Sequence, residues 1–276
     1  MQLSQLFVYP VKSLRGIAVD TVTVRSGRIV GDREWLLVDE QERFLHQRDY
    51  PNMARLEVSF VEGGIRIDAD GMRPLELVST PTIGDGASER HVPLWRRAAA
   101  VTPIPKADAW FREVLGIRCH LMAFDPAREG RSVPWFETPS SLQDATPFHL
   151  VSADSLADLN QRLAVPVSVQ RFRPNLVTSG APPYAEDTWR VFSIGGLTFR
   201  WVKPCTRCAM TMTDHVSGER FSRGPLTALA AYRRFGSEVA FGHYVVSTTA
   251  DGTLSLGDRV AITESTTAPP HSPSPP

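Results

Sequence analysis

The sequence predicts a mainly β (α+β) fold, with a barrel-like sheet and a few helices. Three observations predict it: apolar and polar residues alternate through much of the first hundred positions, three short stretches have helical spacing, and the chain closes with strands around the turn Ala250-Asp251-Gly252-Thr253. The 276 residues, 42% of them hydrophobic, are enough for a sizeable core in one large domain or two small ones.

The first hundred residues are expected to form a β meander with little helix. Alternation of apolar with polar side chains predicts strands at 18–25, 34–38, 44–46, 56–60 and 65–67. The polar run Asp39-Glu40-Gln41-Glu42 predicts the turn between the second and third of these strands.

Helices are expected at three places. Trp110, Phe111, Val114 and Leu115 share one face at helical spacing and predict a helix over 107–115. Ser152 is the expected N-cap of a second helix that runs to Leu163. A third helix is expected over 225–235, because proline is tolerated at a first helical position and Gly236 can end the helix.

Two segments are expected to lack regular structure. Residues 127–146 have no period and contain two prolines and several Ser and Thr residues, which predicts a long loop, and loops of this length in compact domains are often functional lids. Residues 266–276 are rich in Pro, Ser and Thr, which predicts a disordered tail.

Composition excludes several function classes. Thirty basic and thirty acidic side chains cancel, so net charge gives no reason to expect nucleic acid or a membrane surface as a partner. Three cysteines indicate a reducing compartment rather than a disulfide scaffold. The first ten residues have neither a basic region nor a long apolar run, so we expect neither a signal peptide nor a membrane anchor, and a cytoplasmic location.

Two cysteines lie in the segment Lys203-Pro204-Cys205-Thr206-Arg207-Cys208, after a predicted hairpin over 191–200 whose Gly195-Gly196 pair can form a tight turn. Both are expected just past a strand end, in a short loop with two cations beside them. Nearby cations favour the thiolate, which is the form that acts as a nucleophile and as a metal ligand. The segment therefore predicts one reactive or metal-bound cysteine.

Three other interpretations of the Cys-x-x-Cys pair stay open on the residues alone. A zinc site normally needs four ligands, and the chain offers one further cysteine, Cys119, and no closely spaced histidine pair. A thioredoxin-type redox pair is expected to open a helix in a βαβ unit, whereas Pro204 precedes this pair. Two buried, inert cysteines are the third possibility, against which the flanking charges and Asp214 weigh.

Basic residues next to predicted strand boundaries could bind an anionic ligand. They are Lys12 beside Ser13, Arg33, Arg48 and the arginines of Arg171-Phe172-Arg173-Pro174-Asn175. Arginine binds phosphate through two parallel hydrogen bonds, and an asparagine amide offers both a donor and an acceptor to a heterocycle. The alternative is that each charge is simply solvated, for example along an edge strand, and the sequence alone does not bring them together.

Four motifs in this order resemble the MOSC proteins, in the branch with an N-terminal MOSC β-barrel domain that includes the mitochondrial amidoxime-reducing component. They are Tyr9-Pro10-Val11-Lys12-Ser13, Arg171-Phe172-Arg173-Pro174-Asn175, Tyr184-Ala185-Glu186-Asp187-Thr188-Trp189, and the segment from Lys203 through Cys208 to Asp214. The resemblance implies an N-terminal β-rich MOSC subdomain, residues 1–118, packed on a MOSC β-barrel, residues 119–262, with a tail over 263–276.

The resemblance also implies a cofactor and its contacts. Family members bind the molybdenum cofactor, molybdopterin with molybdenum, and a protein cysteine ligates the metal; here that cysteine corresponds to Cys208, and Cys205 has a supporting role. Asp214 is implied as a supporting or proton-delivery group in catalysis. The implied cofactor contacts are Lys12, Ser13, Arg33, Arg48, Thr146, Ser152, Arg173, Asn175 and Arg207.

The activity that this branch implies is the two-electron reduction of N-hydroxylated compounds such as amidoximes, hydroxylamines and N-hydroxylated bases. Because no cysteine follows Cys208, we expect electrons from a separate donor, either a ferredoxin or a small haem protein with its reductase. MOSC domains also occur in molybdenum-cofactor sulfurases, which leaves a cofactor-binding or sulfur-carrier module with a cysteine persulfide as the alternative. Pyridoxal phosphate binding is expected only at the level of that wider family, since nothing here resembles the lysine-bearing pyridoxal phosphate domain.

Overall fold

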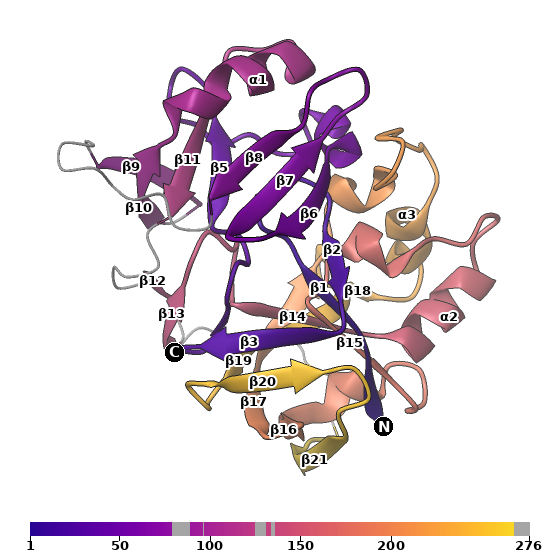
Figure 1. Cartoon of the computed structure of the whole chain (residues 1–276). Coiled ribbons are helices and arrows are strands. Elements are labelled where there is room, and N and C mark those ends of the chain that lie inside the picture. Colours follow the sequence, from indigo (N-terminus) through magenta and orange to yellow (C-terminus); the bar gives the residue numbers. More distant parts are fainter. Residues whose placement is uncertain (79–88, 96, 125–130, 134–135, 268–276) are drawn as a thin grey trace.

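The computed structural model describes residues 1–78, 89–95, 97–124, 131–133 and 136–267. It is built mainly of strands, with few and short helices, which confirms the predicted fold class (Figure 1). No helix in these ranges is long and apolar enough to cross a membrane. The predicted disordered tail falls mostly on residues 268–276, which lie outside the described residues.

The largest sheet curls into a barrel. Its strand order is β2-β1-β15-β14-β19-β17-β16-β21, with β18 paired to β19. The strands are β1 (Gln2–Val8), β2 (Ile17–Val19), β14 (Phe148–Ser152), β15 (Leu176–Ser179), β16 (Trp189–Ile194), β17 (Leu197–Thr206), β18 (Arg234–Phe235), β19 (Glu238–Ser247) and β21 (Val260–Ser265). The barrel closes where β1 meets the start of β21: Leu3 N donates to Asp258 O at 2.8 Å, and Val260 N donates to Met1 O at 3.0 Å.

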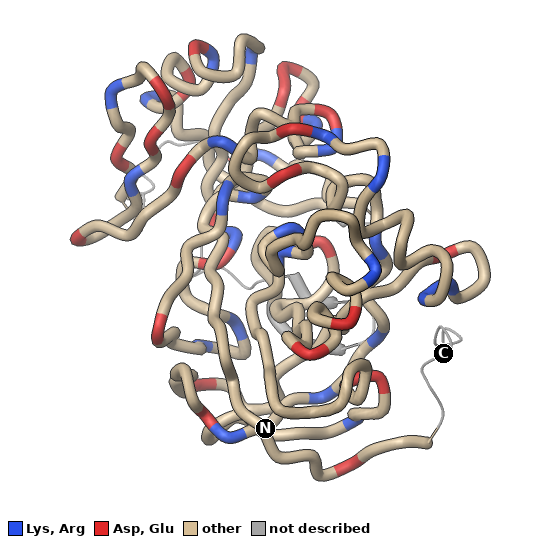
Figure 2. The backbone as a smooth tube through the Cα atoms, turned by 90° about the vertical axis from the view of Figure 1, so that its right-hand side faces the viewer, with Lys and Arg blue, Asp and Glu red and all other residues tan. Residues whose placement is uncertain are grey.

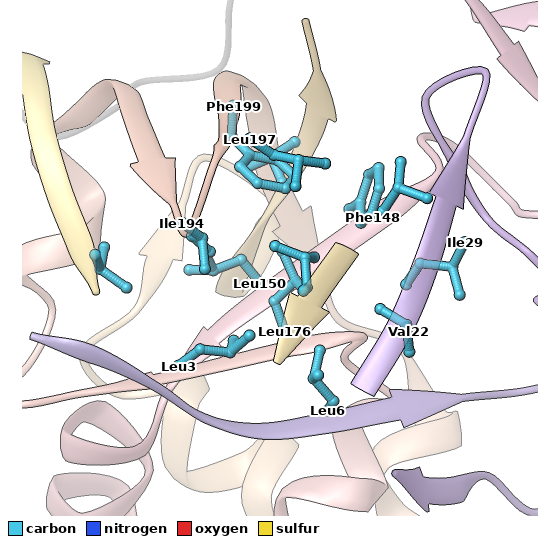
Figure 3. Packing of buried hydrophobic residues seen from close by; sticks show 14 of the residues in the cluster. Leu3, Leu6, Val22, Ile29, Phe148, Leu150, Leu176, Ile194, Leu197 and Phe199 are labelled. Atoms are coloured by element: carbon cyan, nitrogen blue, oxygen red, sulfur yellow. The ribbon is translucent and has the colours of Figure 1, made fainter. Parts of the chain in front are cut away.

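Leucine, isoleucine, valine and phenylalanine side chains fill the barrel. Leu3, Leu6, Leu150, Leu176 and Phe199 are each at most 1% exposed and converge from four strands (Figure 3). A small sheet of β3 (Thr21–Arg25), β4 (Arg28–Ile29) and β20 (Gly252–Ser255) packs on the same core through valine and leucine side chains. Burial of this apolar surface is the main driving force for the barrel.

The N-terminal part of the chain has a second core under two sheets. The first sheet has the order β5-β11-β10-β9 and the second β6-β7-β8. The strands are β5 (Trp35–Val38), β6 (Glu57–Val61), β7 (Gly64–Asp68), β8 (Leu75–Val78), β9 (Arg90–Leu94), β10 (Arg97–Pro103) and β11 (His120–Phe124). Because β11 pairs with β5, strand pairing crosses the predicted boundary at 118/119; the division into 1–118 and 119–262 stays a prediction.

Helix α1 (Pro105–Leu115) packs on this second core, as its sequence predicts. Pro105 occupies the first turn, and Ala107 and Phe111, one turn apart, are fully buried. Gly116 ends the helix in the left-handed conformation, with φ of 67°.

Helices α2 (Ala153–Gln161) and α3 (Pro225–Ala230) pack on the outside of the barrel beside Phe7, Val151 and Phe241. Ser152 is the N-cap of α2, as predicted, because its side chain accepts from the N–H groups of Asp154 and Ser155. Four 3₁₀ turns complete the helical structure: η1 (Pro51–Arg55), η2 (Val169–Phe172), η3 (Ala185–Thr188) and η4 (Ala209–Met212).

The third helix is shorter than predicted. It ends at Ala230, and Arg234–Phe235 form β18, which pairs with Val239 and Glu238 of β19. Gly236, expected to end a helix, lies in the turn of this small hairpin with φ of 61°. Pairing with a long neighbouring strand therefore outweighs the local helical pattern.

Three predictions about the strands are wrong. The first hundred residues do not form one meander, since their strands join four different sheets. The expected strand at 44–46 is reduced to a single bridge between Phe44 and Val38. The expected loop over 127–146 contains the paired strands β12 (Arg131–Val133) and β13 (Phe136–Ser140), while residues 127–130 and 134–135 of that prediction lie outside the described residues. Alternation of apolar and polar residues can identify a strand but not the strand with which it pairs. Strands of three to five residues, such as β12 and β13, are too short to show a clear alternation.

The cap of α2 gives a test of stability. Ser152→Ala removes the acceptor for the N–H groups of Asp154 and Ser155, so we expect the free energy of unfolding to fall by about 1 kcal/mol. Ser152→Thr retains a capping hydroxyl and is the matched control, with a smaller loss. Urea unfolding followed by far-UV circular dichroism measures both. A loss in the alanine variant no larger than in the threonine variant would contradict the capping role.

Candidate functional site

A cavity of about 530 Å³ lies between the barrel and the N-terminal part of the chain. All of the predicted site residues except Asp214 and Ser152 line it. The residues it brings together are Lys12, Ser13, Arg33, Arg48, Thr146, Arg173, Asn175, Arg207 and Cys208. Segments far apart in the sequence therefore converge on one site, and the volume is in the range of small-molecule binding sites.

The β16–β17 hairpin delivers the cysteine segment to this cavity. Gly195 forms the predicted turn with φ of 56°, where a side chain would lie 2.6 Å from the Asp258 carboxylate. Strand β17 runs on to Thr206, so Cys205 lies within the strand and is 2% exposed, whereas the prediction placed both cysteines beyond it. Cys208 lies two residues past the strand end and is exposed. Both cysteines line the cavity, but of the two only Cys208 is exposed, which makes its thiol the more accessible one.

Cys205 is held in a hydrogen-bonded cluster. The guanidinium of Arg207 donates from Nη1 to Cys205 Sγ at 2.6 Å and from Nη2 to the carbonyl of Phe172 at 2.9 Å. Burial raises the pKa of the Cys205 thiol, and Arg207 and a hydrogen bond with Tyr244 oppose this only in part. The expectation that neighbouring cations would favour a thiolate is therefore wrong for Cys205, because desolvation outweighs them.

Arg33 and Asn175 are joined through the buried carboxylate of Asp32. Arg33 Nη1 donates to both carboxylate oxygens at 2.7 Å and to Asn175 Oδ1 at 3.0 Å. Asn175 Nδ2 donates to Asp32 Oδ1 and to the carbonyl of Phe7, both at 3.1 Å. Asn175 thus lines the cavity while its side-chain amide makes hydrogen bonds within the protein. Strand β15, which begins at Leu176, lies between β1 and β14 inside the sheet, so this segment is not at a sheet edge.

Three cavity arginines have no carboxylate partner among the residues that the structure describes: Arg48, Arg173 and Arg207. Arg173 donates to the carbonyl of Leu14 at 2.6 Å, and burial lowers its pKa to about 10. Arg48 lies over the Trp95 ring, 4.8 Å from its centroid. The buried Nε atoms of Arg48 and Arg207 have no hydrogen-bond partner within the described part of the chain. Unpaired charge and unused donors of this kind favour an anionic ligand.

Lys12 and Asp144 form a second ion pair at the cavity wall. Lys12 Nζ bonds to Asp144 and donates to the carbonyl of Leu142 at 2.9 Å, and Trp95 Nε1 also donates to Asp144 at 2.8 Å. Burial alone raises the pKa of Asp144, but the Lys12 ammonium and these hydrogen bonds outweigh it and lower the pKa to about 2. Asp144 is therefore ionised at neutral pH and neutralises one of the cavity's cations.

Several cavity residues have an unusual backbone. Ser13, Arg33, Trp95 and Arg173 have φ values of 68°, 51°, 56° and 56°. Left-handed conformations cost side chains of this kind roughly 1 kcal/mol each, and they persist where surrounding contacts fix them. Four left-handed residues in one cavity lining indicate that the surrounding contacts fix the directions of these side chains.

Thr146, Ser152 and Asp214 are placed differently. Thr146 lines the cavity, and its hydroxyl donates to the carbonyl of Phe148 at 2.7 Å. Ser152 caps α2 and does not line the cavity. Asp214 also lies outside the lining: it pairs with Arg171 at 2.7 Å and accepts from the N–H groups at 216 and 217. Burial raises the pKa of Asp214, but these hydrogen bonds lower it to about 2, so it holds no proton at neutral pH.

The sequence missed His149, Tyr244 and Trp95 as cavity residues. His149 had a signal, since it is the one polar side chain between apolar residues of a strand that is buried throughout. Its Nδ1 faces the carbonyl of Arg173 at 3.3 Å, its Nε2 faces Arg207 at 3.5 Å, and its ring lies against Tyr244. Burial, and then Arg207, hold the pKa of His149 well below 6.5. His149 is therefore neutral in the folded protein.

The neutral His149 predicts a pH dependence of stability. The unfolded chain takes up a proton at this residue as the pH falls below about 6.5, whereas the folded protein does not, so folding loses about 1.4 kcal/mol per pH unit below that value. We expect His149→Leu to reduce this slope between about pH 5 and 6.5. Urea unfolding at each pH measures it, with His91→Leu, at an exposed histidine, as the control. An unchanged slope in His149→Leu would count against the assignment.

Metal ligation at this site could draw on few protein groups. Across the ranges that the structure describes, no three His, Cys, Asp or Glu side chains gather at one point. A metal at Cys208 would therefore take most of its ligands from a cofactor or from solvent. This arrangement differs from a structural zinc site.

Comparison with known proteins identifies the family. The MOSC N-terminal beta barrel domain matches residues 1–118 and the MOSC domain matches residues 137–261. Mitochondrial amidoxime reducing component 2 of Rattus norvegicus is 30% identical over 94% of this chain and 82% of its own length. Molybdenum cofactor sulfurase of Oryza sativa subsp. japonica is 31% identical over 88% of this chain, which spans only 32% of that relative.

Solved structures add little. The YUAD protein of Bacillus subtilis aligns with 94% of this chain and 93% of its own at 11% identity and a TM-score of 0.41. A likeness of that size carries no argument about the site. The matches in sequence are decisive instead, and this chain belongs to the MOSC-domain proteins with an N-terminal MOSC β-barrel domain.

Proposed function

We propose that this protein binds the molybdenum cofactor in the cavity and reduces N-hydroxylated compounds with it. The observation that carries the proposal is the exposed thiol of Cys208 in a cavity whose arginines at 48, 173 and 207 have no carboxylate partner in the described part of the chain. The relatives named amidoxime reducing components, 82% of whose length this chain spans, support the reductase. The sulfurases give weaker support for a shared activity, because this chain spans only about a third of their length.

The residues present fit such a cofactor. Its phosphate is an anion with several acceptors, and the buried Nε atoms of Arg48 and Arg207 are donors without a partner within the described ranges. A soft thiolate suits a metal that already has sulfur ligands, and Cys208 is the accessible thiol. Lys12, Arg33 and Arg48 would hold the anionic part from the N-terminal part of the chain. Thr146, Arg173, Asn175 and Arg207 would contact it from the part that matches the MOSC domain.

A bound molybdenum centre supplies two-electron redox chemistry and a position for a substrate oxygen. Reduction of an N–OH group to N–H consumes two electrons and two protons and releases water. Burial raises the pKa of the Cys205 thiol and of the Tyr244 phenol, so both cavity side chains are neutral at pH 7 and act there as hydrogen-bonding groups rather than as acids. Asp214 is ionised and outside the cavity, so we assign it to the turn after η4 rather than to proton delivery. Electrons would come from a ferredoxin or a small haem protein with its reductase.

The two cysteines make a matched pair for the test of the site. We expect protein from a host that makes the cofactor to carry molybdenum and pterin in near-stoichiometric amounts. Cys208→Ala should lose most of the metal, because the accessible thiol is gone, whereas Cys205→Ala should retain it. Metal analysis and the fluorescence of the released pterin measure both contents, and benzamidoxime reduction with a chemically reduced donor measures activity.

Three outcomes would count against this function. Wild-type protein without molybdenum and pterin, or with zinc in their place, would contradict cofactor binding. Equal loss of metal in both variants would contradict the assignment of Cys208. A persulfide on Cys208, together with no reduction of any N-hydroxylated compound, would replace the reductase by a sulfur carrier.

Asp214→Asn tests the assignment of that residue. Asparagine keeps the acceptor for the N–H groups at 216 and 217 and loses only the charge that pairs with Arg171. We expect a loss of stability of about 1 kcal/mol and a turnover within about twofold of wild type, measured by urea unfolding and benzamidoxime reduction. A fall in kcat of a hundredfold with unchanged metal content would instead support proton delivery.

A further inference from the structure

Tyr9 packs against two arginines that line the cavity but does not line the cavity itself. Its ring is 1% exposed, and the guanidinium carbons of Arg33 and Arg173 each lie 4.3 Å from the ring centroid. The backbone of Tyr9 is hydrogen-bonded to the Asp32–Arg33 pair: its N–H donates to Asp32 Oδ1 at 2.9 Å, and its carbonyl accepts from Arg33 N at 2.8 Å. Two buried like charges therefore share one aromatic ring.

The hydroxyl of Tyr9 takes no part in this arrangement. It is buried and has no hydrogen-bond partner within the described residues. Burial raises the pKa of Tyr9 to about 12, so the phenol stays neutral and the ring keeps its ordinary negative face. The electrostatic attraction of a guanidinium to an aromatic ring depends on that face and not on the hydroxyl.

Arg173 depends on the ring more than Arg33 does. Arg33 is paired with Asp32, whereas Arg173 has no carboxylate partner in the described ranges and is fixed by the carbonyl of Leu14 and by the ring. Desolvation penalises a buried, unpaired guanidinium, and the ring offsets part of that cost.

Gly16 shows how closely the ring is held. A Cβ added at this position would lie 2.3 Å from Tyr9 Cε1, 2.7 Å from Cδ1 and 2.8 Å from Cζ. Gly16 is not among the residues with positive φ, so a left-handed backbone is not the reason for glycine at this position. The position of the Tyr9 ring is thus what excludes a side chain there.

We propose that Tyr9 is a positioning residue that holds Arg33 and Arg173 in the direction in which they bind an anion in the cavity. Gly16 leaves the space that this position of the ring requires. The inference rests on the proposed function only in taking the cavity as the anion site, and it concerns the aromatic face alone. A substitution that keeps the ring should keep binding, and one that removes or displaces the ring should weaken it.

The test uses the 276-residue chain without cofactor and inorganic phosphate as the probe, with the dissociation constant measured by calorimetry. We expect Tyr9→Phe to bind as wild type does, because only the unpartnered hydroxyl is lost. Tyr9→Leu should bind about tenfold more weakly, since it has no aromatic face. Gly16→Ala should weaken binding to a similar extent, because its methyl displaces the ring.

The double variant Tyr9→Leu/Gly16→Ala separates positioning from general damage. Leucine lacks the Cε1 and Cζ atoms, and its Cδ atoms can rotate about χ2 away from the new methyl, so the two effects should combine to less than their product. Thermal unfolding of each variant shows that the proteins compared are folded, and Tyr9→Phe and Gly16→Ala decide the matter if Tyr9→Leu does not fold.

Several results would overturn the inference: wild-type protein that binds no phosphate, Gly16→Ala protein that binds as wild type does, or effects of the two substitutions that multiply fully. Loss of binding in Tyr9→Phe would move the role from the ring to the hydroxyl and also overturn it. Molybdenum and pterin content, measured separately in wild-type protein, decides the proposed function, so the two can fail independently.

Discussion

The cavity depends on one buried carboxylate, that of Asp32, which is 1% exposed. It accepts hydrogen bonds from the N–H of Tyr9, the guanidinium of Arg33, and the side-chain amides of Gln143 and Asn175. These donors come from four segments that span the sequence from the end of β1 to the start of β15. A buried charge is tolerated only with partners of this number and quality, so the four segments are held where the carboxylate requires them.

A chain without net charge nevertheless builds a cationic site. Basic and acidic residues are intermixed along the described backbone (Figure 2). The sequence has no long run of basic residues. Asp32 and Asp144 each neutralise one cation of the cavity, whereas Arg48, Arg173 and Arg207 are left without a carboxylate among the described residues. The positive character of the site is thus made by folding, which brings single arginines together, and composition gives no sign of it.

Sequence patterns predicted the parts of the fold that are locally determined. The Gly195-Gly196 turn, the Ser152 cap and the buried stripe of α1 depend on residues within one or two turns of each other. The partners of the strands and the early end of α3 depend on distant chain segments, which is why the predicted meander and the longer helix were wrong. The tertiary context decided these features.

The residues of the candidate site likewise fall into those that sequence motifs predicted and those that only the structure shows. Basic residues named from motifs do converge on the cavity, and family resemblance supplied the reason to group them. Asp32, Tyr9 and His149 were not recognised as parts of the site, because their roles follow from burial and from contacts with residues more than twenty positions away. The raised pKa of Cys205, which keeps its thiol neutral, likewise follows from burial. The neighbouring Lys and Arg residues in the sequence suggest the opposite shift.

The central claim is that Cys208 ligates a molybdenum centre held by the arginines of this cavity. X-ray absorption at the molybdenum edge tests it most directly, because it counts the sulfur ligands of the metal. We expect one sulfur ligand fewer in Cys208→Ser than in wild type, and an unchanged number in Cys205→Ser. The same sulfur count in wild type and Cys208→Ser, or a spectrum from wild-type protein that shows no sulfur ligands, would contradict it.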